Sequence, residues 1–210
     1  MKQFTERPKV EGTTRIEAFS DGVLAIIVTL LIFEVHVPQL TDLSTQGVLA
    51  SLWSIAPKLI SFAVSFFTVA IFWVNHHHFF TRVTHSDWKL LWLNNILLFW
   101  LTVVPFTTAF IGDYPTVPIV VALYALTLCL AGASFSLMGN YVFFHSGLMP
   151  ESVSLSERRS EFRRSLSATG LYGVAALIAL FWVQAALVLV AVIPFFYVVP
   201  RLLNRQTSNQ

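Results

Sequence analysis

Cysteine, charge and catalytic motifs are all scarce in this sequence. A single cysteine, Cys129, excludes a disulfide within the chain and any metal site that needs two thiolates from one chain. The sequence contains no GxSxG nucleophile elbow, no phosphate-binding glycine loop, no HExxH pair and no TVGYG filter. We therefore expect no catalytic residues, no bound metal and no cofactor, and we expect that the protein is not an enzyme.

Charged residues make up only 11% of the chain, whereas 56% of it is hydrophobic and the mean hydropathy is +0.71. Such a composition predicts an integral membrane protein. A helix needs about 20 mainly apolar residues to cross a bilayer, and six windows of this kind occur. We predict an all-α fold with one transmembrane domain over 1–210 and six spans, near 17–37, 46–74, 90–112, 116–143, 166–182 and 185–203.

The positive charges are distributed unevenly between the predicted loops. Twelve of the 13 lysines and arginines fall on one side of the six spans, and only Lys58 lies inside a span. The positive-inside rule then places both termini in the cytoplasm. Arginines flank the apolar stretch 166–203 on both sides, so we expect two short spans that turn near Gln184 rather than one long helix. A net charge of +2 gives no indication of a nucleic-acid partner.

The chain begins like a secretory signal, because a basic segment precedes an apolar run. No cleavage site of small residues follows Phe33, so we expect the first span to be retained.

Polar residues inside the spans concentrate at one depth. Asp21 lies about one turn into the first span, His76 and His77 end the second, and Asn94 lies about one turn into the third. Ionisable groups in a membrane usually face the protein interior and have partners. We predict a structural clasp in which Arg15, one of the two histidines and Asn94 hold Asp21.

Two other roles for the same residues remain open. Histidine titrates near neutrality, so a proton relay or pH sensor is possible, and a proton-coupled secondary transporter that uses Asp21 with His76 and His77 is the alternative function. The prolines do not fall at matching points of two halves, as the interrupted helices of such transporters often do. A metal site has less support, because consecutive histidines on a helix point about 100° apart.

The first span is too uniformly apolar for its sequence alone to mark a functional face. One face carries Gly22, Ala25, Ile26, Thr29, Leu30 and Phe33. The small residues on this face are typical of close helix packing. The Thr29 hydroxyl could simply bond the carbonyl four residues earlier.

Three motifs follow one another in the first three spans. The first is an RxxxFSD signature at the cytoplasmic end of the first span. The second is a tryptophan shortly before the histidines, and the third is an asparagine eleven residues before a proline. The residues of these motifs are Arg15, Phe19, Ser20, Asp21, Trp73, His76, His77, Asn94 and Pro105. In these motifs the first three spans resemble the bacterial branch of the transmembrane protein 175 family of potassium channels.

This resemblance implies a potassium-selective, leak-type channel in a bacterial cell membrane. It also implies a homotetramer of six-span subunits with a pore lined by the first helices. The implied constriction residues are Ile26, Thr29, Leu30 and Phe33. The implied structural network behind the pore consists of Arg15, Phe19, Ser20, Asp21, Trp73, His76, His77 and Asn94. The expected partners are other copies of the chain, the lipid bilayer and permeant potassium ions.

Overall fold

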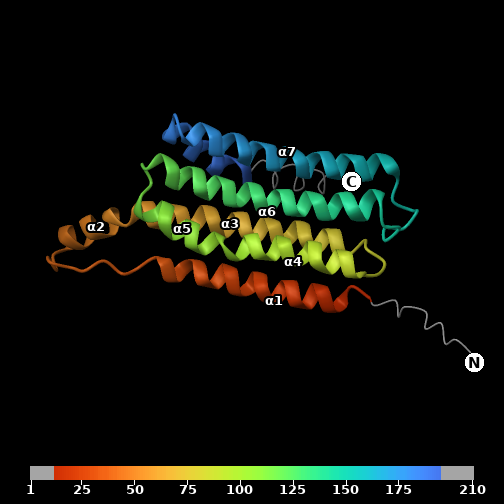
Figure 1. The fold of residues 1–210 in the computed structure, drawn as a ribbon. Helices are drawn as coiled ribbons and strands as arrows, with labels where there is room; N and C mark the ends of the chain where they lie inside the picture. Colours follow the sequence, from red (N-terminus) through yellow and green to blue (C-terminus); the bar gives the residue numbers. More distant parts are fainter. Residues whose placement is uncertain (1–11, 195–210) are drawn as a thin grey trace, which may run out of the picture.

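The part of the chain that the structure describes, residues 12–194, is built from helices that lie alongside one another in a bundle (Figure 1). In this computed structural model the labelled elements are α1 Thr14–Leu30, η1 Leu31–Glu34, α2 Thr45–Ser54, α3 Ala56–Phe80, α4 Trp88–Thr102, α5 Val104–Asp113, α6 Pro118–Phe144 and α7 Leu155–Ala179. A further helix spans Val183–Pro194. The all-helical fold class predicted from the composition is confirmed.

Of the helical stretches that the structure describes, four are long and apolar enough to cross a membrane. They are Thr14–Glu34, Ala56–Phe80, Trp88–Asp113 and Pro118–Phe144, in the same order as the first four predicted spans. Helix α7 is also long, but arginines and glutamates crowd its first half. The helix Val183–Pro194 is shorter than a full crossing. Within residues 12–194, length and composition thus identify four candidate spans, two fewer than the sequence predicted.

The second predicted span, 46–74, differs from the structure at both ends. Helix α2 ends at Ser54, and α3 begins at Ala56 with Pro57 in its first turn. Proline has no backbone N–H and favours the first turn of a new helix, so the two helices are separate. Helix α2 buries none of its side chains and projects from the end of the bundle (Figure 1). Helix α3 continues to Phe80 and therefore contains the whole histidine stretch.

The third and fifth predicted spans and the turn after the fifth also differ from the structure. The third span is divided at Val103, because Pro105 cannot continue the hydrogen-bond ladder of α4. The fifth, predicted as 166–182, begins eleven residues earlier at Leu155, where Ser154 and Glu157 form a capping box. The turn after it falls at residues 180–182 rather than at Gln184. Residues 195–203 of the sixth predicted span lie outside the described residues.

Helix α6 lies at the centre of the packing, where it contacts α4, α5 and α7. Helix α1 packs on α3 and α4, and it runs along the opposite side of the bundle from α7 (Figure 1). At the α6–α7 contact, a Cβ added to Gly132 would lie 2.8 Å from the Thr169 hydroxyl oxygen. The absence of a side chain at Gly132 therefore lets these two helices approach closely.

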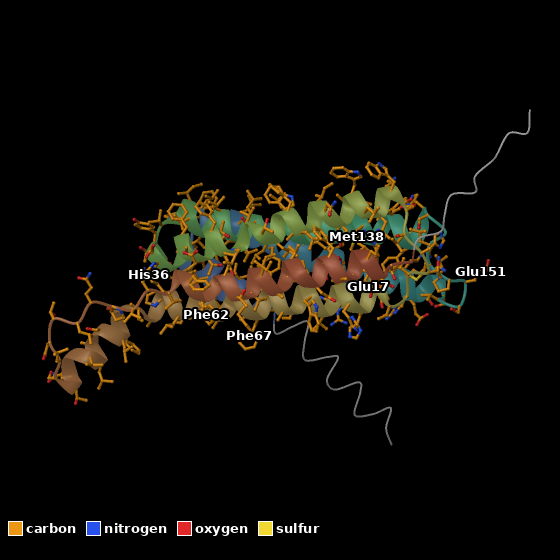
Figure 2. The ribbon with its side chains drawn as sticks, turned by 90° about the horizontal axis from the view of Figure 1, so that it is seen from below. Glu17, His36, Phe62, Phe67, Met138 and Glu151 are labelled. Atoms are coloured by element: carbon orange, nitrogen blue, oxygen red, sulfur yellow. The ribbon has the colours of Figure 1, made fainter. Side chains whose placement is uncertain are left out.

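The two ends of the bundle differ in charge. Figure 2 shows Glu17, at the start of α1, at the same end as Glu151, which precedes α7, whereas His36 lies at the other end. The first of these ends also holds the ion pair between Arg82 and Glu161, whose atoms are 2.5 Å apart. This end also carries the starts of α1, α4 and α7 (Figure 1), and with them Arg15, Lys89 and the arginines of α7. Among the described residues, the cations that the sequence assigned to one side therefore gather at one end of the bundle.

Candidate functional site

Helix α1 buries one face and exposes the other. The buried side chains of α1 and η1 are Ile16, Ser20, Leu24, Ile27 and Leu31. Their spacing of three or four residues places them on one stripe of a helix. This stripe faces α3, α4 and α5, so packing fixes the rotation of α1 about its own axis.

The exposed face of α1 carries the four residues predicted to form a constriction. In the single chain, Ile26 is 59% exposed, Leu30 is 45% exposed and Phe33 is 72% exposed, and Thr29 lies among them. No charged side chain occurs between Gly22 and Phe33. Such a face is costly to leave in water, so it meets either lipid or another protein chain.

The Thr29 hydroxyl is satisfied within its own helix. Its oxygen lies 2.9 Å from the Ile26 carbonyl oxygen and 3.1 Å from that of Ala25, and it donates its proton to this pair. The local bond that the sequence allowed is therefore present. Because the proton points back to the helix, the lone pairs of the oxygen remain available on the exposed face.

Behind α1, three buried side chains link three helices in one chain of hydrogen bonds. The Asn94 amide nitrogen donates to the Ser20 hydroxyl at 3.0 Å, and the Asn94 amide oxygen lies 2.8 Å from His76 Nε2. Ser20 in turn donates to the Ile16 carbonyl at 2.7 Å. All three side chains are at most 2% exposed. No buried polar atom of these three side chains lacks a hydrogen-bond partner, so the network holds α1 against α3 and α4 at little cost.

Asp21 has a different partner from the one expected. Its carboxylate accepts a hydrogen bond of 2.8 Å from the indole Nε1 of Trp73, whose ring stacks on that of His77. His76 pairs with Asn94 instead. The predicted clasp of Asp21 with a histidine and Asn94 is thus divided into two separate contacts. The carboxylate–imidazole pair on which the transporter alternative depended is not formed.

The other two members of the expected network lie apart from it. The ion pairs within the described residues join Lys58 to Asp113 and Arg82 to Glu161, and Arg15 belongs to neither. The expected contact of Arg15 with Asp21 is therefore corrected. The physical reason is their separation by six residues, which turns the two side chains to different sides of α1. Phe19 is 58% exposed beside the other residues of the open face.

A second buried network was not predicted from the sequence. The Thr108 hydroxyl lies 2.7 Å from that of Ser65, which in turn lies 2.8 Å from the Tyr124 hydroxyl. These residues join α5, α3 and α6. The sequence feature that could have indicated this network is the presence of hydroxyl side chains within apolar spans. Hydroxyls in such spans often bond their own helix, so the sequence did not indicate this cross-helix contact.

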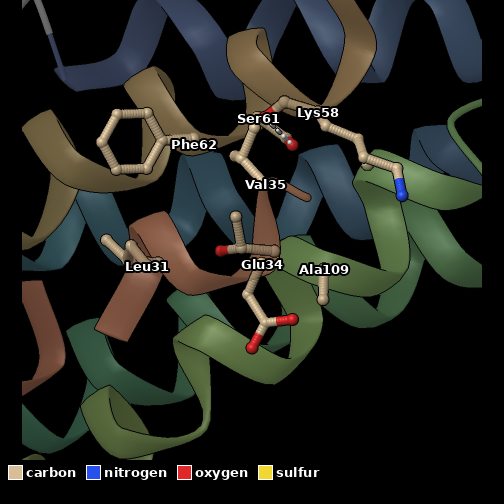
Figure 3. Close-up of a pocket in the computed structure, with 9 residues that line it drawn as sticks. Leu31, Glu34, Val35, Lys58, Ser61, Phe62 and Ala109 are labelled. Carbon is tan, nitrogen blue, oxygen red and sulfur yellow. Dashed lines mark hydrogen bonds between the residues drawn. The ribbon is translucent and has the colours of Figure 1, made fainter. Parts of the chain in front are cut away.

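The far end of the bundle carries the one lysine that the sequence placed in a span. Lys58 on α3 pairs with Asp113 at the end of α5 at 2.5 Å. A small cavity beside this pair, lined by residues that include Glu34 and Phe62, has a volume of about 10 Å³ (Figure 3). That volume is about the room needed for one water molecule. Among the described residues, no group of three histidine, cysteine or acidic side chains could hold a metal ion.

Comparison with known proteins places this geometry in a family. A family model described as the endosomal/lysosomal potassium channel TMEM175 matches residues 15–105. A protein of Chamaesiphon minutus, named as a potassium channel, is 34% identical over 173 residues, which cover 81% of this chain and 85% of that protein. The chain belongs to the TMEM175 family.

Other members of the TMEM175 family are similar to the chain over much of its length. A potassium channel of a Chryseobacterium strain is 36% identical over 154 residues, which cover 73% of this chain and 76% of that protein. The crystal structure of a lysosomal potassium-selective TMEM175 homologue from Chamaesiphon minutus matches 90% of this chain and 97% of that one, with a TM-score of 0.79 and 30% identity. The human protein named as an endosomal/lysosomal proton channel is 28% identical over 200 residues, which cover only 38% of its length.

Proposed function

We propose that this protein is a potassium-selective, leak-type channel in a bacterial cell membrane. The observation that carries the proposal is the match along 90% of the chain to a solved potassium-selective TMEM175 homologue, with a TM-score of 0.79. Bacterial relatives at 34% and 36% identity are named as potassium channels. Potassium is the permeant ion, and no cofactor is required.

Four copies of the chain assemble around a central pore in this proposal. The support is the apolar face of α1, which carries exposed Ile26 and Phe33 while the opposite face is packed against the bundle. Four such faces around an axis would cover one another and leave a narrow path between them. Helix α7, on the other side of the bundle, then faces outward.

The narrowest part of the pore is a ring of Ile26 side chains, followed by Thr29, Leu30 and Phe33. An apolar neck forces an ion to shed water and offers no ligand in return. Potassium holds its water less tightly than sodium and crosses such a neck at lower cost. The Thr29 oxygen, with lone pairs left free, returns part of the lost hydration. Selectivity in this proposal thus comes from dehydration.

Each subunit crosses the membrane six times, with both termini in the cytoplasm. Four spans have the length and composition of membrane helices. The remaining two are α7 and the helix that begins at Val183, which form a hairpin. Cation-rich connections at one end of the bundle support this orientation.

Single-channel recording of the purified full-length protein in a planar bilayer tests the proposed function. We expect unitary currents and, with potassium and sodium on opposite sides, a reversal potential shifted toward the potassium equilibrium potential. A parallel recording of an Ile26 variant, with an altered reversal potential, would show that this protein carries the current. Potassium flux without unitary events would instead indicate an alternating-access carrier and overturn the proposal.

The orientation gives a separate prediction from cysteine labelling. In a background that carries Cys129→Ala, Ser156→Cys and Ser208→Cys should react only with reagents that reach the cytoplasm, and Gln46→Cys should react from outside. The Gln46→Cys variant leaves in place Asp42, whose carboxyl accepts hydrogen bonds from Ser44 that lower its pKa and fix the segment before α2. Labelling of Ser156→Cys and Ser208→Cys from opposite sides would contradict the six-span count.

A further inference from the structure

One face of α7 is exposed along its whole length, and its side chains change from charged at the start of the helix to apolar further along. Arg159 and Arg163 lie on it near the start of the helix, followed by Leu166, Val174 and Leu177. With the exposed Gly170 between Leu166 and Val174, these positions recur every three or four residues and so share one side of the helix. The face therefore carries two cations at one end and an apolar stripe beyond them.

Among the described residues, neither Arg159 nor Arg163 forms an ion pair. The nearby Glu161 is bonded to Arg82, and Glu157 is bonded to the cap residue Ser154. The two arginines stand four residues apart, where like charges on a helix repel each other. A bound anion would relieve that repulsion.

The depth of these arginines can be read from cross-helix contacts. The Ser165 hydroxyl lies 2.8 Å from that of Ser136 on the antiparallel α6. About one and a half turns later on α6, Tyr141 donates to Asp87, the residue that caps α4. Arg159 and Arg163 therefore lie near the level of the first turn of α4.

That turn of α4 carries exposed tryptophans. Trp88 is 72% exposed and Trp92 is 52% exposed, and their rings meet edge to face. Tryptophan is enriched at the boundary between lipid headgroups and hydrocarbon. The two arginines are thus at headgroup level, with Leu166 and the apolar stripe extending into the hydrocarbon.

We propose that Arg159 and Arg163 bind the phosphate of an anionic phospholipid whose acyl chains lie along the apolar stripe of α7. Arginine presents a planar fork of donors that matches phosphate oxygens. A shallow hollow at this point is lined by the two arginines, Ser156 and Phe162. The outward position of this face rests on the proposed tetramer, in which α1 is central. A free phosphate ion would satisfy the arginines but would leave the stripe unused.

Native mass spectrometry of the purified full-length protein, titrated with phosphatidylglycerol, tests this site. In the double variant Arg159→Gln/Arg163→Gln we expect the apparent Kd for phosphatidylglycerol to rise about 25-fold, because each of the two cations near an anionic headgroup contributes about fivefold in affinity. Binding of phosphatidylcholine should be unchanged. The variant Arg159→Lys/Arg163→Lys, which keeps the charge, should recover part of the affinity.

A matched control removes two positive charges elsewhere, as Lys2→Gln/Arg7→Gln, and should leave the Kd within about twofold of the wild type. An unchanged Kd in the arginine double variant would overturn the proposal. Displacement of the lipid by an equal concentration of inorganic phosphate would also overturn it, by assigning the arginines to a soluble anion. Potassium current is recorded on the same preparations. Arginine-dependent lipid binding by a wild-type protein without current would refute the channel and leave the lipid site standing.

Discussion

Replacing Ile26 with asparagine is expected to lower the preference for potassium over sodium by at least about tenfold. That change corresponds to about 1.4 kcal/mol in the difference between the two permeation barriers. The amide group wets a neck that the isoleucine keeps dry, so both ions retain more of their water as they pass. Conductance should rise at the same time. The measurement is the reversal potential with potassium and sodium on opposite sides, together with the unitary conductance.

Ile27 gives a matched control for this experiment, because it has the same side chain one position along the helix. It is only 2% exposed and packs into the core of the bundle. Ile27→Ala should therefore cost about 2–4 kcal/mol of stability through a cavity, and leave the permeability ratio unchanged. Ile26→Ala should do the reverse. If Ile27→Ala alters the potassium preference while Ile26→Ala does not, the assignment of the pore face is wrong.

The sequence predicted the position of α1 in the chain more accurately than the direction in which each of its side chains points. Its apolar run and the polar residues at its start were visible, because length and hydropathy are properties of the chain alone. The rotation of α1 was not visible, because almost every position from Gly22 to Phe33 is apolar. Only the packed bundle shows that Leu24 and Ile27 face inward and Ile26 faces outward.

Side-chain pairing was the least predictable feature. Depth in the membrane brought Asp21, His76 and Asn94 to one level, but depth does not fix the direction in which each side chain points. Trp73 is hydrogen-bonded to Asp21, and Asn94 to His76, because the two side chains of each pair lie on facing sides of neighbouring helices. The break between α2 and α3 could have been read from Pro57, but the apolar character of both helices concealed it.

Asn94→Ala is expected to destabilise the folded protein by about 3 kcal/mol. The change leaves His76 Nε2 without its acceptor in a buried site, which costs about 1–3 kcal/mol. The lost side-chain volume adds a further cost. For a chain of this size such a loss lowers the midpoint of thermal unfolding by about 6–12 °C. The measurement is that midpoint for the purified protein, followed by the amount of intact assembly that remains after heating.

Asn95 provides the control, because it has the same side chain at the next position of α4 but is exposed. Asn95→Ala should leave the midpoint within about 2 °C of the wild type. Asp21→Asn should also have a small effect, because the amide oxygen can still accept the Trp73 indole proton at this exposed position. Equal midpoints for Asn94→Ala and Asn95→Ala would contradict a stabilising network. A larger fall in the midpoint for Asp21→Asn than for Asn94→Ala would instead support the predicted clasp around Asp21, because the carboxylate would then contribute more stability than the Asn94 amide.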